Sequence, residues 1–470
     1  MRYFKLLLFF LGGLVLMPSC KKFLDVGNPP DKIVADAVFR TNSSAAAVLT
    51  GIYYDLQGEQ YGVAQGRGSI SLHSGLAADE LTALQDSYLY GEYTNNSRFD
   101  FWTPLYKLIY RANTALEGLS ASSSLDLELK QHLIGEALFL RSFLYFYLVN
   151  LYGDVPLLLT SDYKINSSSS RVASEVVYKQ ILDDLEKAQA LLPEVYVDAT
   201  VLNITDERIR PNKWAALSLM ARVYLYLGKW SEAISSSTKV IENKSLFDTV
   251  ELENVFLKNS KESIWQLQPV DINGLLLNTT DARLFFLYGA PDSYERPVMV
   301  SQFLLDAFEN ADRRKNVWIG DTITMGKSYY YPFKYKLYKE TDPSGEYLTV
   351  IRLSELFLIR SEAEARLGDL AKARQDVNII RHRAGLQDLQ PGSQIQVLSS
   401  ILHERQVELF TEWGHRWLDL KRSQTIDEVM NEICPKKGGV WQSYKRLYEI
   451  PINELRFNKF LIQNPGYPIN

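Results

Sequence analysis

Acidic and histidine side chains near the C-terminus have a spacing seen in metal-binding and acid–base sites. Glu412 and His415 are three residues apart, and Glu404 and Glu408 fall on the same stripe of a predicted helix. Two Glu-x-x-His units on facing helices would predict a carboxylate-bridged dimetal site, but only one such unit occurs. The basic residues close enough to pair with these acids are Arg405, Arg416 and Arg422. We therefore predict structural ion pairs along this stripe and no metal.

The other signals for catalysis are weak. Asp79 and Glu80 are acids that could matter in a glycosidase, but adjacent side chains usually point apart, and the sequence offers no clear acidic partner. The five histidines form no HExxH motif, and no GxGxxG, phosphate-binding loop or GxSxG motif is present. We therefore expect no enzyme, no catalytic residue and no cofactor.

Aromatic residues in polar segments indicate a binding surface instead. The sequence has 28 tyrosines against 21 phenylalanines and 8 tryptophans, and a tyrosine ring with its hydroxyl suits a wet interface. Sugar rings pack their C–H faces on aromatic planes and need polar side chains around them. The candidate ligand-binding residues are Tyr88, Tyr90, Asn95, Asn96, Tyr288, Tyr294 and Trp318. The alternative for each ring is packing against its own loop.

The N-terminus has the pattern of a lipoprotein signal. Arg2 and Lys5 precede an apolar run over residues 6–16 that is too short to span a bilayer. A cysteine soon after such a run is a lipid acceptor, because its thiol can be alkylated once it becomes the new N-terminus. We predict that residues 1–19 are a signal peptide and that Cys20 carries acyl chains. The alternative is an ordinary secretory signal with an incidental cysteine.

The composition is typical of a large globular protein. Of the 470 residues, 46% are hydrophobic and 23% are charged, which is enough for a large core. The net charge of −5 provides no basic surface for nucleic acid. If Cys20 is acylated, Cys434 has no partner for an intrachain disulfide. The segment 137–149 is strongly apolar but contains Arg141 and Ser142, so it predicts a buried helix rather than a membrane span.

Helical periodicity dominates the chain, and one helix pair occurs twice. Helices are expected at about 42–56, from about 104, at 127–151 and at 174–192. The sequence LGKWSEA at 227–233 aligns with LGDLAKA at 367–373, and in both a glycine separates two predicted helices. This is the helix–turn–helix unit of tetratricopeptide repeats, so degenerate copies are expected at 127–192 and 395–425. Between 246 and 350 periodicity weakens and glycine and proline become frequent, as in regions where binding usually occurs.

Several short motifs follow one another along the chain. They are CKKFLD at 20–25, ADEL at 78–81, RAN at 111–113, GEALFLR at 135–141, LYGDVP at 151–156, ARVYL at 221–225, RLSE at 352–355, RWLDLKR at 416–422 and QNPGY at 463–467. In this order, behind a lipoprotein signal, they resemble the SusD/RagB family of outer-membrane nutrient-binding lipoproteins of Bacteroidetes. The resemblance extends from Cys20 to the C-terminus.

The resemblance implies a mainly α fold in which tetratricopeptide-like helix pairs form a scaffold and a loop-rich variable region folds onto it. It divides the chain into a signal peptide (1–19), an N-terminal helical region (20–225) and a C-terminal region (226–470) that includes the loop-rich segment 246–350. It also implies a lipid-anchored protein at the outer membrane, facing outward, that captures an oligosaccharide. The partner would be a TonB-dependent, SusC-like transporter barrel, and no bond in the glycan would be broken.

Two other functions remain open from the sequence. The protein could be a structural partner of a transporter without its own glycan site, or it could bind peptides or another nutrient. A neighbouring reading frame for a TonB-dependent barrel beside glycoside hydrolases would favour glycan binding, whereas neighbouring peptidases would favour peptides.

Overall fold

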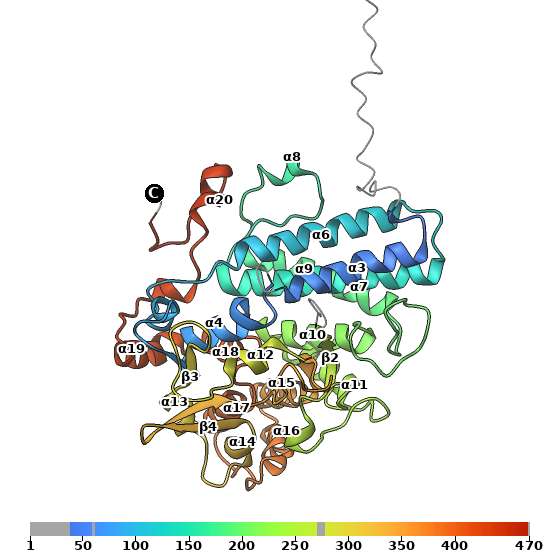
Figure 1. Ribbon diagram of the computed structural model, residues 1–470. Helices are drawn as coiled ribbons and strands as arrows, with labels where there is room; N and C mark the ends of the chain where they lie inside the picture. Colours follow the sequence, from blue (N-terminus) through green and yellow to red (C-terminus); the bar gives the residue numbers. More distant parts are fainter. Residues whose placement is uncertain (1–37, 59–61, 270–277, 469–470) are drawn as a thin grey trace, which may run out of the picture.

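The computed structural model describes residues 38–58, 62–269 and 278–468, so the predicted signal peptide and Cys20 lie outside the described residues. The described part is mainly helical, with three small antiparallel sheets, which confirms the predicted fold class. In Figure 1 the long helices α3, α6, α7 and α9 lie together across the top, and α10, α11 and α15–α17 continue below them. The strands lie in this lower part of the view.

The long helices form a continuous stack. They are α3 (Asn42–Gln57), α6 (Trp102–Ala121), α7 (Leu127–Tyr152), α9 (Ser174–Leu191), α10 (Lys213–Tyr226), α11 (Trp230–Ile241), α15 (Leu353–Arg366), α16 (Leu370–Arg383) and α17 (Gln394–Glu408). Helix α6 packs on α7, α7 on α9, α9 on α10, α10 on α11, α11 on α15, and α15 on both α16 and α17. The helices predicted from periodicity therefore exist and pack on their neighbours.

The repeated turn has the backbone that its glycines predict. Gly228 between α10 and α11 has φ +67°, and Gly368 between α15 and α16 has φ +89°, a region that disfavours side chains with a Cβ. The alanines one turn later, Ala233 and Ala373, are fully buried where the paired helices meet. The further pairs expected at 127–192 and 395–425 are α7 with α9 and α17 with α18 (His415–Arg422), which pack on each other.

Helix α7 is the centre of this stack. Within the described residues it is the one helix long and apolar enough to cross a membrane, but 94% of that apolar window is buried inside the protein. Its Arg141 donates to Asp184 at 2.7 Å and to Asn113 at 2.9 Å, so the charge inside the core is paired. The helix is thus a core element, as predicted.

Short helices and strands that periodicity did not reveal lie in the loop-rich segment and in the connections between the long helices. The strands pair as β1 (Leu81–Ala83) with β3 (Val298–Val300), β2 (Ser263–Leu267) with β6 (Leu348–Arg352) and β4 (Ile319–Thr324) with β5 (Lys327–Pro332). The short helices are α4 (Ile70–Ala77), α5 (Tyr90–Tyr93), α8 (Tyr163–Asn166), α12 (Thr280–Phe285), α13 (Gln302–Ala307), α14 (Arg313–Val317), α19 (Ile426–Lys436) and α20 (Ile452–Phe457), with 3-10 turns η2 (Gly66–Gly68), η3 (Leu252–Asn254) and η4 (Ser443–Arg446).

A small second core lies apart from the main one. Its members are Leu72, Leu76, Leu81, Ala83, Leu89, Leu284, Phe285 and Val298. They come from α4, β1, α12, β3 and the residue just before α5, and Leu81 pairs with Val300 across the β1–β3 ladder. This core joins the segment around residue 80 to the segment around residue 290, which are far apart in sequence.

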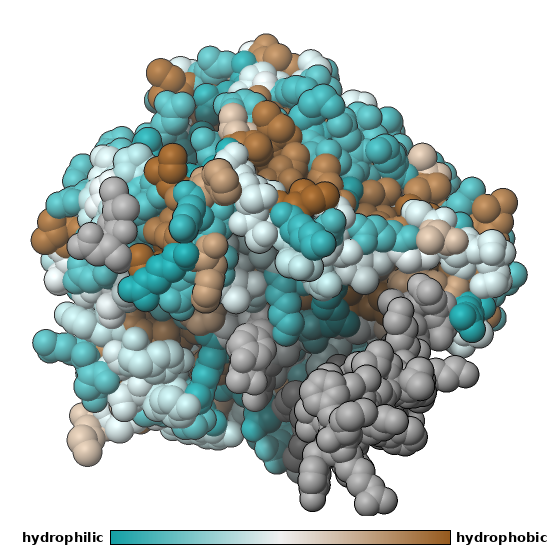
Figure 2. All heavy atoms as spheres, turned by 90° about the horizontal axis from the view of Figure 1, so that it is seen from above, coloured by the Kyte–Doolittle hydropathy of each residue, from teal (hydrophilic) through white to brown (hydrophobic). Residues whose placement is uncertain are grey.

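The face seen from above has apolar residues gathered in patches between hydrophilic ones (Figure 2). Helices α8 and α20 project on this side of the molecule in Figure 1. They expose Tyr163, Ile165 and Phe457. This side of the molecule therefore offers apolar contact area as well as polar groups.

The predicted acidic stripe is an ion-paired structure, but its partners are different from those expected. Arg352 contacts Glu408 at 2.6 Å, Glu412 at 2.7 Å and Glu262 at 2.8 Å. The three arginines proposed from sequence pair elsewhere: Arg405 with Asp419, Arg416 with Asp79, and Arg422 with Glu362 and Asp419. The partners of the stripe come from distant segments, which sequence spacing could not show.

Candidate ligand-binding site

Two of the predicted tyrosines meet at the surface. Tyr88 lies just before α5, Tyr294 lies between α12 and β3, and their ring centroids are 5.9 Å apart. Tyr88 is 49% exposed and Tyr294 is 59% exposed, so both rings can be reached from solvent. The small second core beneath them holds the two segments together.

Arginines lie over the rings of Tyr294 and of a third predicted tyrosine, Tyr288. The guanidinium of Arg67 lies over the ring of Tyr294, 4.1 Å from its centroid, and Arg67 pairs with Glu295 at 3.2 Å. The guanidinium of Arg296 lies 4.6 Å from the ring centroid of Tyr288, which is 64% exposed. The structure therefore combines aromatic faces, cationic donors and a carboxylate in one area.

A hollow of about 470 Å³ opens beside these residues. It is lined by Gly66, Arg67, Thr280, Arg283, Leu284, Glu295 and Arg296. Arg283 donates to Glu340 at 3.0 Å. The volume is within the range of small-molecule sites, and most of the lining residues are polar.

The loop that carries Arg67 is fixed by hydrogen bonds to α12 and to Thr279, the residue just before α12. The buried carboxylate of Asp281 accepts from the N–H of Gly66 at 2.6 Å. Gln65 accepts from the hydroxyl of Thr279 at 2.8 Å and from the N–H of Thr280 at 3.0 Å. Gly66 has φ +68°, and an added Cβ would lie 2.9 Å from the Thr280 hydroxyl. The hydrogen bond from Gly66 to Asp281 and the backbone conformation of Gly66 therefore both help to set the direction of Arg67.

The turn that carries Tyr294 is held by one carboxylate. Asp292 accepts from the N–H of Tyr294 at 2.8 Å and of Arg296 at 3.0 Å. Partial burial would raise the pKa of Asp292, but these backbone N–H groups hold it below its ordinary value. The turn thus has a fixed shape that presents Tyr294 and Glu295 outward.

Asp281 makes the stability of this region depend on pH. Burial raises the pKa of Asp281 to about 7, against an ordinary value of 3.8, although the Gly66 N–H opposes this. Between these values the folded state binds more protons than the unfolded state, so the contribution of Asp281 to stability falls as pH rises. We expect Asp281→Asn to raise the free energy of unfolding at pH 8 by about 1–3 kcal/mol, since it keeps the acceptor without the buried charge.

Urea unfolding at pH 5 and pH 8 measures this difference. Asp292→Asn is the matched control, because the depressed pKa of Asp292 predicts the opposite sign, a loss of stability at pH 8. An Asp281→Asn variant less stable than the parent at pH 8 would show that the charged form of Asp281 is the favoured one.

Three predicted site residues, Tyr90, Asn95 and Asn96, follow Tyr88 closely in the sequence. Tyr90 is half-buried in α5, with its ring centroid 6.1 Å from that of Tyr93, and Asn96 is exposed and donates to Thr94 at 3.1 Å. Asn95 is 2% exposed and donates to the carbonyl of Ala77 at 3.1 Å. The structure corrects the expectation that Asn95 is open to a ligand: its side chain holds the loop and does not face solvent.

The structure also corrects the expectation that Trp318 is open to a ligand. Its ring is fully buried, its indole N–H donates to the carbonyl of Leu252 at 3.0 Å, and it packs edge-on against Phe256. A ring in this position stabilises the core and has no face open to a ligand. The sequence signal failed because an aromatic residue in a loop-rich segment can be buried by elements that are distant in sequence.

Several residues of the hollow were missed from sequence. Arg67, Arg283 and Arg296 stand in no recognisable motif, and only Glu295 and Arg296 could have been noticed as polar neighbours of Tyr294. The bond from Gly66 to Asp281 spans 215 residues, so no local pattern could place Arg67 beside the second tyrosine. The position of Arg67 depends on how its loop pairs with α12.

The adjacent acids Asp79 and Glu80 lie under the surface. Asp79 pairs with Arg416 at 2.6 Å. Burial and the neighbouring Asp79 raise the pKa of Glu80 to about 8. Neither residue lines the hollow. Among the residues that the structure describes, no three His, Cys, Asp or Glu side chains are grouped as metal ligands.

Comparison with known proteins gives the family. Residues 22–225 match a family model described as "Starch-binding associating with outer membrane", and residues 310–467 match the model of the SusD family. The curated SusD-like protein P25 of Formosa agariphila is 23% identical, with 96% of this chain and 97% of that protein covered.

Solved structures share the fold. A SusD superfamily protein from Bacteroides vulgatus has a TM-score of 0.75 and 22% identity, covering 91% of this chain and 99% of its own. A laminarin-binding SusD-like protein has a TM-score of 0.74 and 23% identity, covering 90% of this chain and 99% of its own. The stacked helix pairs are therefore the tetratricopeptide-like scaffold of these structures. Taken together, the two family matches and the shared scaffold show that this chain belongs to the SusD/RagB family.

Proposed function

We propose that this protein is a glycan-binding lipoprotein of the outer membrane that captures oligosaccharides and delivers them to a TonB-dependent, SusC-like transporter. The single observation that carries the proposal is the pair of exposed rings, Tyr88 and Tyr294, beside an arginine-lined hollow. The SusD family membership and the laminarin-binding relative support a carbohydrate as the ligand. Cys20 would hold the protein at the membrane through acyl chains.

The mechanism that we propose is capture without chemistry. A sugar ring stacks its C–H face on Tyr294 or Tyr88, and the guanidinium groups of Arg67 and Arg283 donate to its hydroxyls. Glu295 accepts from a hydroxyl, and its pairing with Arg67 keeps it oriented. A shallow site of this kind binds with modest affinity, which is offset when a tethered protein holds its ligand close to a transporter.

Affinity gel electrophoresis with a panel of polysaccharides that includes laminarin tests this function. We expect at least one neutral polysaccharide to retard the protein, and product analysis after long incubation to show no shortened chains. Release of oligosaccharides by protein free of contaminating hydrolases would contradict capture without cleavage. A panel with no retardation would favour a structural partner of the transporter, and retention on peptides would favour another nutrient.

A further inference from the structure

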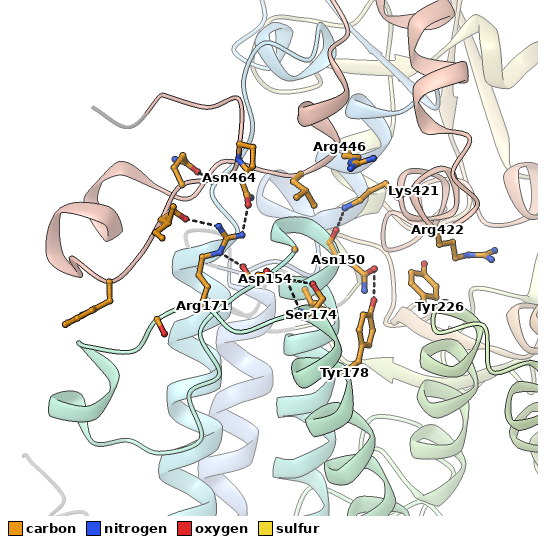
Figure 3. Close-up of a pocket in the computed structure, with 18 residues that line it drawn as sticks. Asn150, Asp154, Arg171, Ser174, Tyr178, Tyr226, Lys421, Arg422, Arg446 and Asn464 are labelled. Carbon is orange, nitrogen blue, oxygen red and sulfur yellow. Dashed lines mark hydrogen bonds between the residues drawn. The ribbon is translucent and has the colours of Figure 1, made fainter.

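A second cavity lies on another part of the molecule, where the end of α7 meets α9, α18 and the C-terminal segment (Figure 3). Its volume is about 750 Å³. Its polar lining includes Asn150, Asp154, Arg171, Ser174, Lys421 and Arg446. No residue of the tyrosine site lines it.

Three cations that line this cavity, Arg171, Lys421 and Arg446, have no carboxylate partner among the described residues. Figure 3 shows Lys421 and Arg446 side by side at its wall. The ammonium group of Lys421 donates to the backbone carbonyl of Asn150. Arg446 is exposed, and its guanidinium forms no hydrogen bond or ion pair with the described residues. Burial, together with the charges of Arg446 and Arg98, lowers the pKa of Lys421 to about 7, as expected for a cation without a compensating anion.

The donors of Arg171 and the charges of Asp154 and Arg422 already have partners within the chain. Arg171 donates to the carbonyls of Asp154 and Ile462, and Asp154 accepts from the N–H and hydroxyl of Ser174. Arg422 pairs with Glu362 at 2.7 Å. The positive charge of Lys421 and Arg446 is therefore left for a group from outside the chain.

The rim of the cavity is apolar. Phe460 is 60% exposed and Ile462 is 73% exposed, and Leu447 lies beside Arg446. Tyr226 also lines the cavity, and its buried hydroxyl has no hydrogen-bond partner. A ligand that suits this lining has an anionic group at one end and a flat or apolar face next to it.

We propose that this cavity is a second ligand site, which binds a saccharide bearing an anionic group, either a carboxylate or a sulfate ester. Lys421 and Arg446 pair with the anion, and the sugar face packs on apolar side chains of the lining. The proposal goes beyond neutral glycan capture at the tyrosines and does not depend on it. The bound anion would also remove the repulsion between the two cations, which favours binding.

Isothermal titration of the purified protein with D-glucuronate, glucose 6-sulfate, glucose and sodium sulfate at low ionic strength tests this site. We expect both acidic sugars to bind and glucose not to bind. Lys421→Met and Arg446→Met should each weaken the binding of the acidic sugars about tenfold, the effect of losing one charge-assisted hydrogen bond. Lys436→Met is the matched control, because Lys436 is exposed and pairs with Glu432 on α19.

Each outcome decides the proposal. Failure of both acidic sugars to bind, or equal binding by Lys421→Met, Arg446→Met and the parent, overturns it. Sodium sulfate that binds as tightly as glucose 6-sulfate would show an adventitious ion only and overturn the saccharide part. If circular dichroism shows that Lys421→Met does not fold, the Arg446→Met variant alone tests the proposal, because Arg446 is exposed. Tyr294→Ala should leave this binding intact, so failure here is distinguishable from failure of the tyrosine site.

Discussion

We expect Arg352→Met to lower the free energy of unfolding by about 3–5 kcal/mol, because removal of one partner from a buried ion pair leaves uncompensated charges. Arg352 is 1% exposed and lies at the end of β6, where it contacts Glu262, Glu408 and Glu412. A methionine side chain extends over a similar length but has no charge and no hydrogen-bond donor. The three carboxylates would then be buried with fewer counter-charges.

The charges around Arg352 show why the loss should be large. Burial alone would raise the pKa of Glu408, but Arg383, Arg352 and Arg314 hold it well below its ordinary range. Glu408 therefore stays charged in the folded state and needs its partners. These side chains join β6, α14, α16 and α17, so the network connects the loop-rich segment to the helix stack.

Chemical denaturation of the parent and variant measures this effect. Arg313→Met is the matched control: Arg313 is about half exposed, and its contacts with Glu251 and Glu253 are 3.5 and 3.8 Å long. We expect it to change stability by less than about 1 kcal/mol, since exposed ion pairs contribute little. A loss of under 1 kcal/mol for Arg352→Met would show that the buried network contributes no more than the exposed pair.

The second large effect is on ligand affinity. We expect Tyr294→Ala to weaken binding of the oligosaccharide selected by the gel screen by about 10- to 100-fold, the range found when a central aromatic contact is truncated. Tyr294 contacts both Tyr88 and Arg67, so its loss removes one stacking surface and frees the other two side chains. Titration calorimetry gives the affinities.

Two further variants separate stacking from general damage. Tyr294→Phe keeps the ring and should retain affinity within about threefold, because stacking depends on the face rather than the hydroxyl. Tyr163→Ala removes a tyrosine that is 71% exposed on α8, outside the site, and should have no effect. Equal loss in Tyr294→Ala and Tyr163→Ala would argue against a localised site.

The helical scaffold could be predicted because its signals are local. The glycine and alanine of each repeated turn lie within seven residues of sequence, and α10 with α11 and α15 with α16 form as expected. The strands could not be predicted in the same way, because each has only three to six residues and pairs with a partner far along the chain or across a tight turn. The order of the family motifs predicted the family and the mainly α fold class, but it predicted none of these strands.

The site was predicted only in part. Tyr88, Tyr288 and Tyr294 are exposed, as expected for rings in polar loops, and the structure adds Arg67 over Tyr294 and Arg296 over Tyr288; their role in binding stays a prediction. Trp318 and Asn95 had the same sequence signal but are buried by packing that no local pattern reports. The arginines were missed because a guanidinium over a ring is a property of tertiary contact and not of spacing.

A crystal structure of the protein with the oligosaccharide from the gel screen tests the central claim most directly. The account predicts a sugar ring on the face of Tyr294 or Tyr88, with its hydroxyls within hydrogen-bond distance of Arg67 or Arg283 and the glycan uncleaved. A neutral sugar bound elsewhere with the two tyrosines uncovered, or a shortened glycan beside a carboxylate pair, would contradict it.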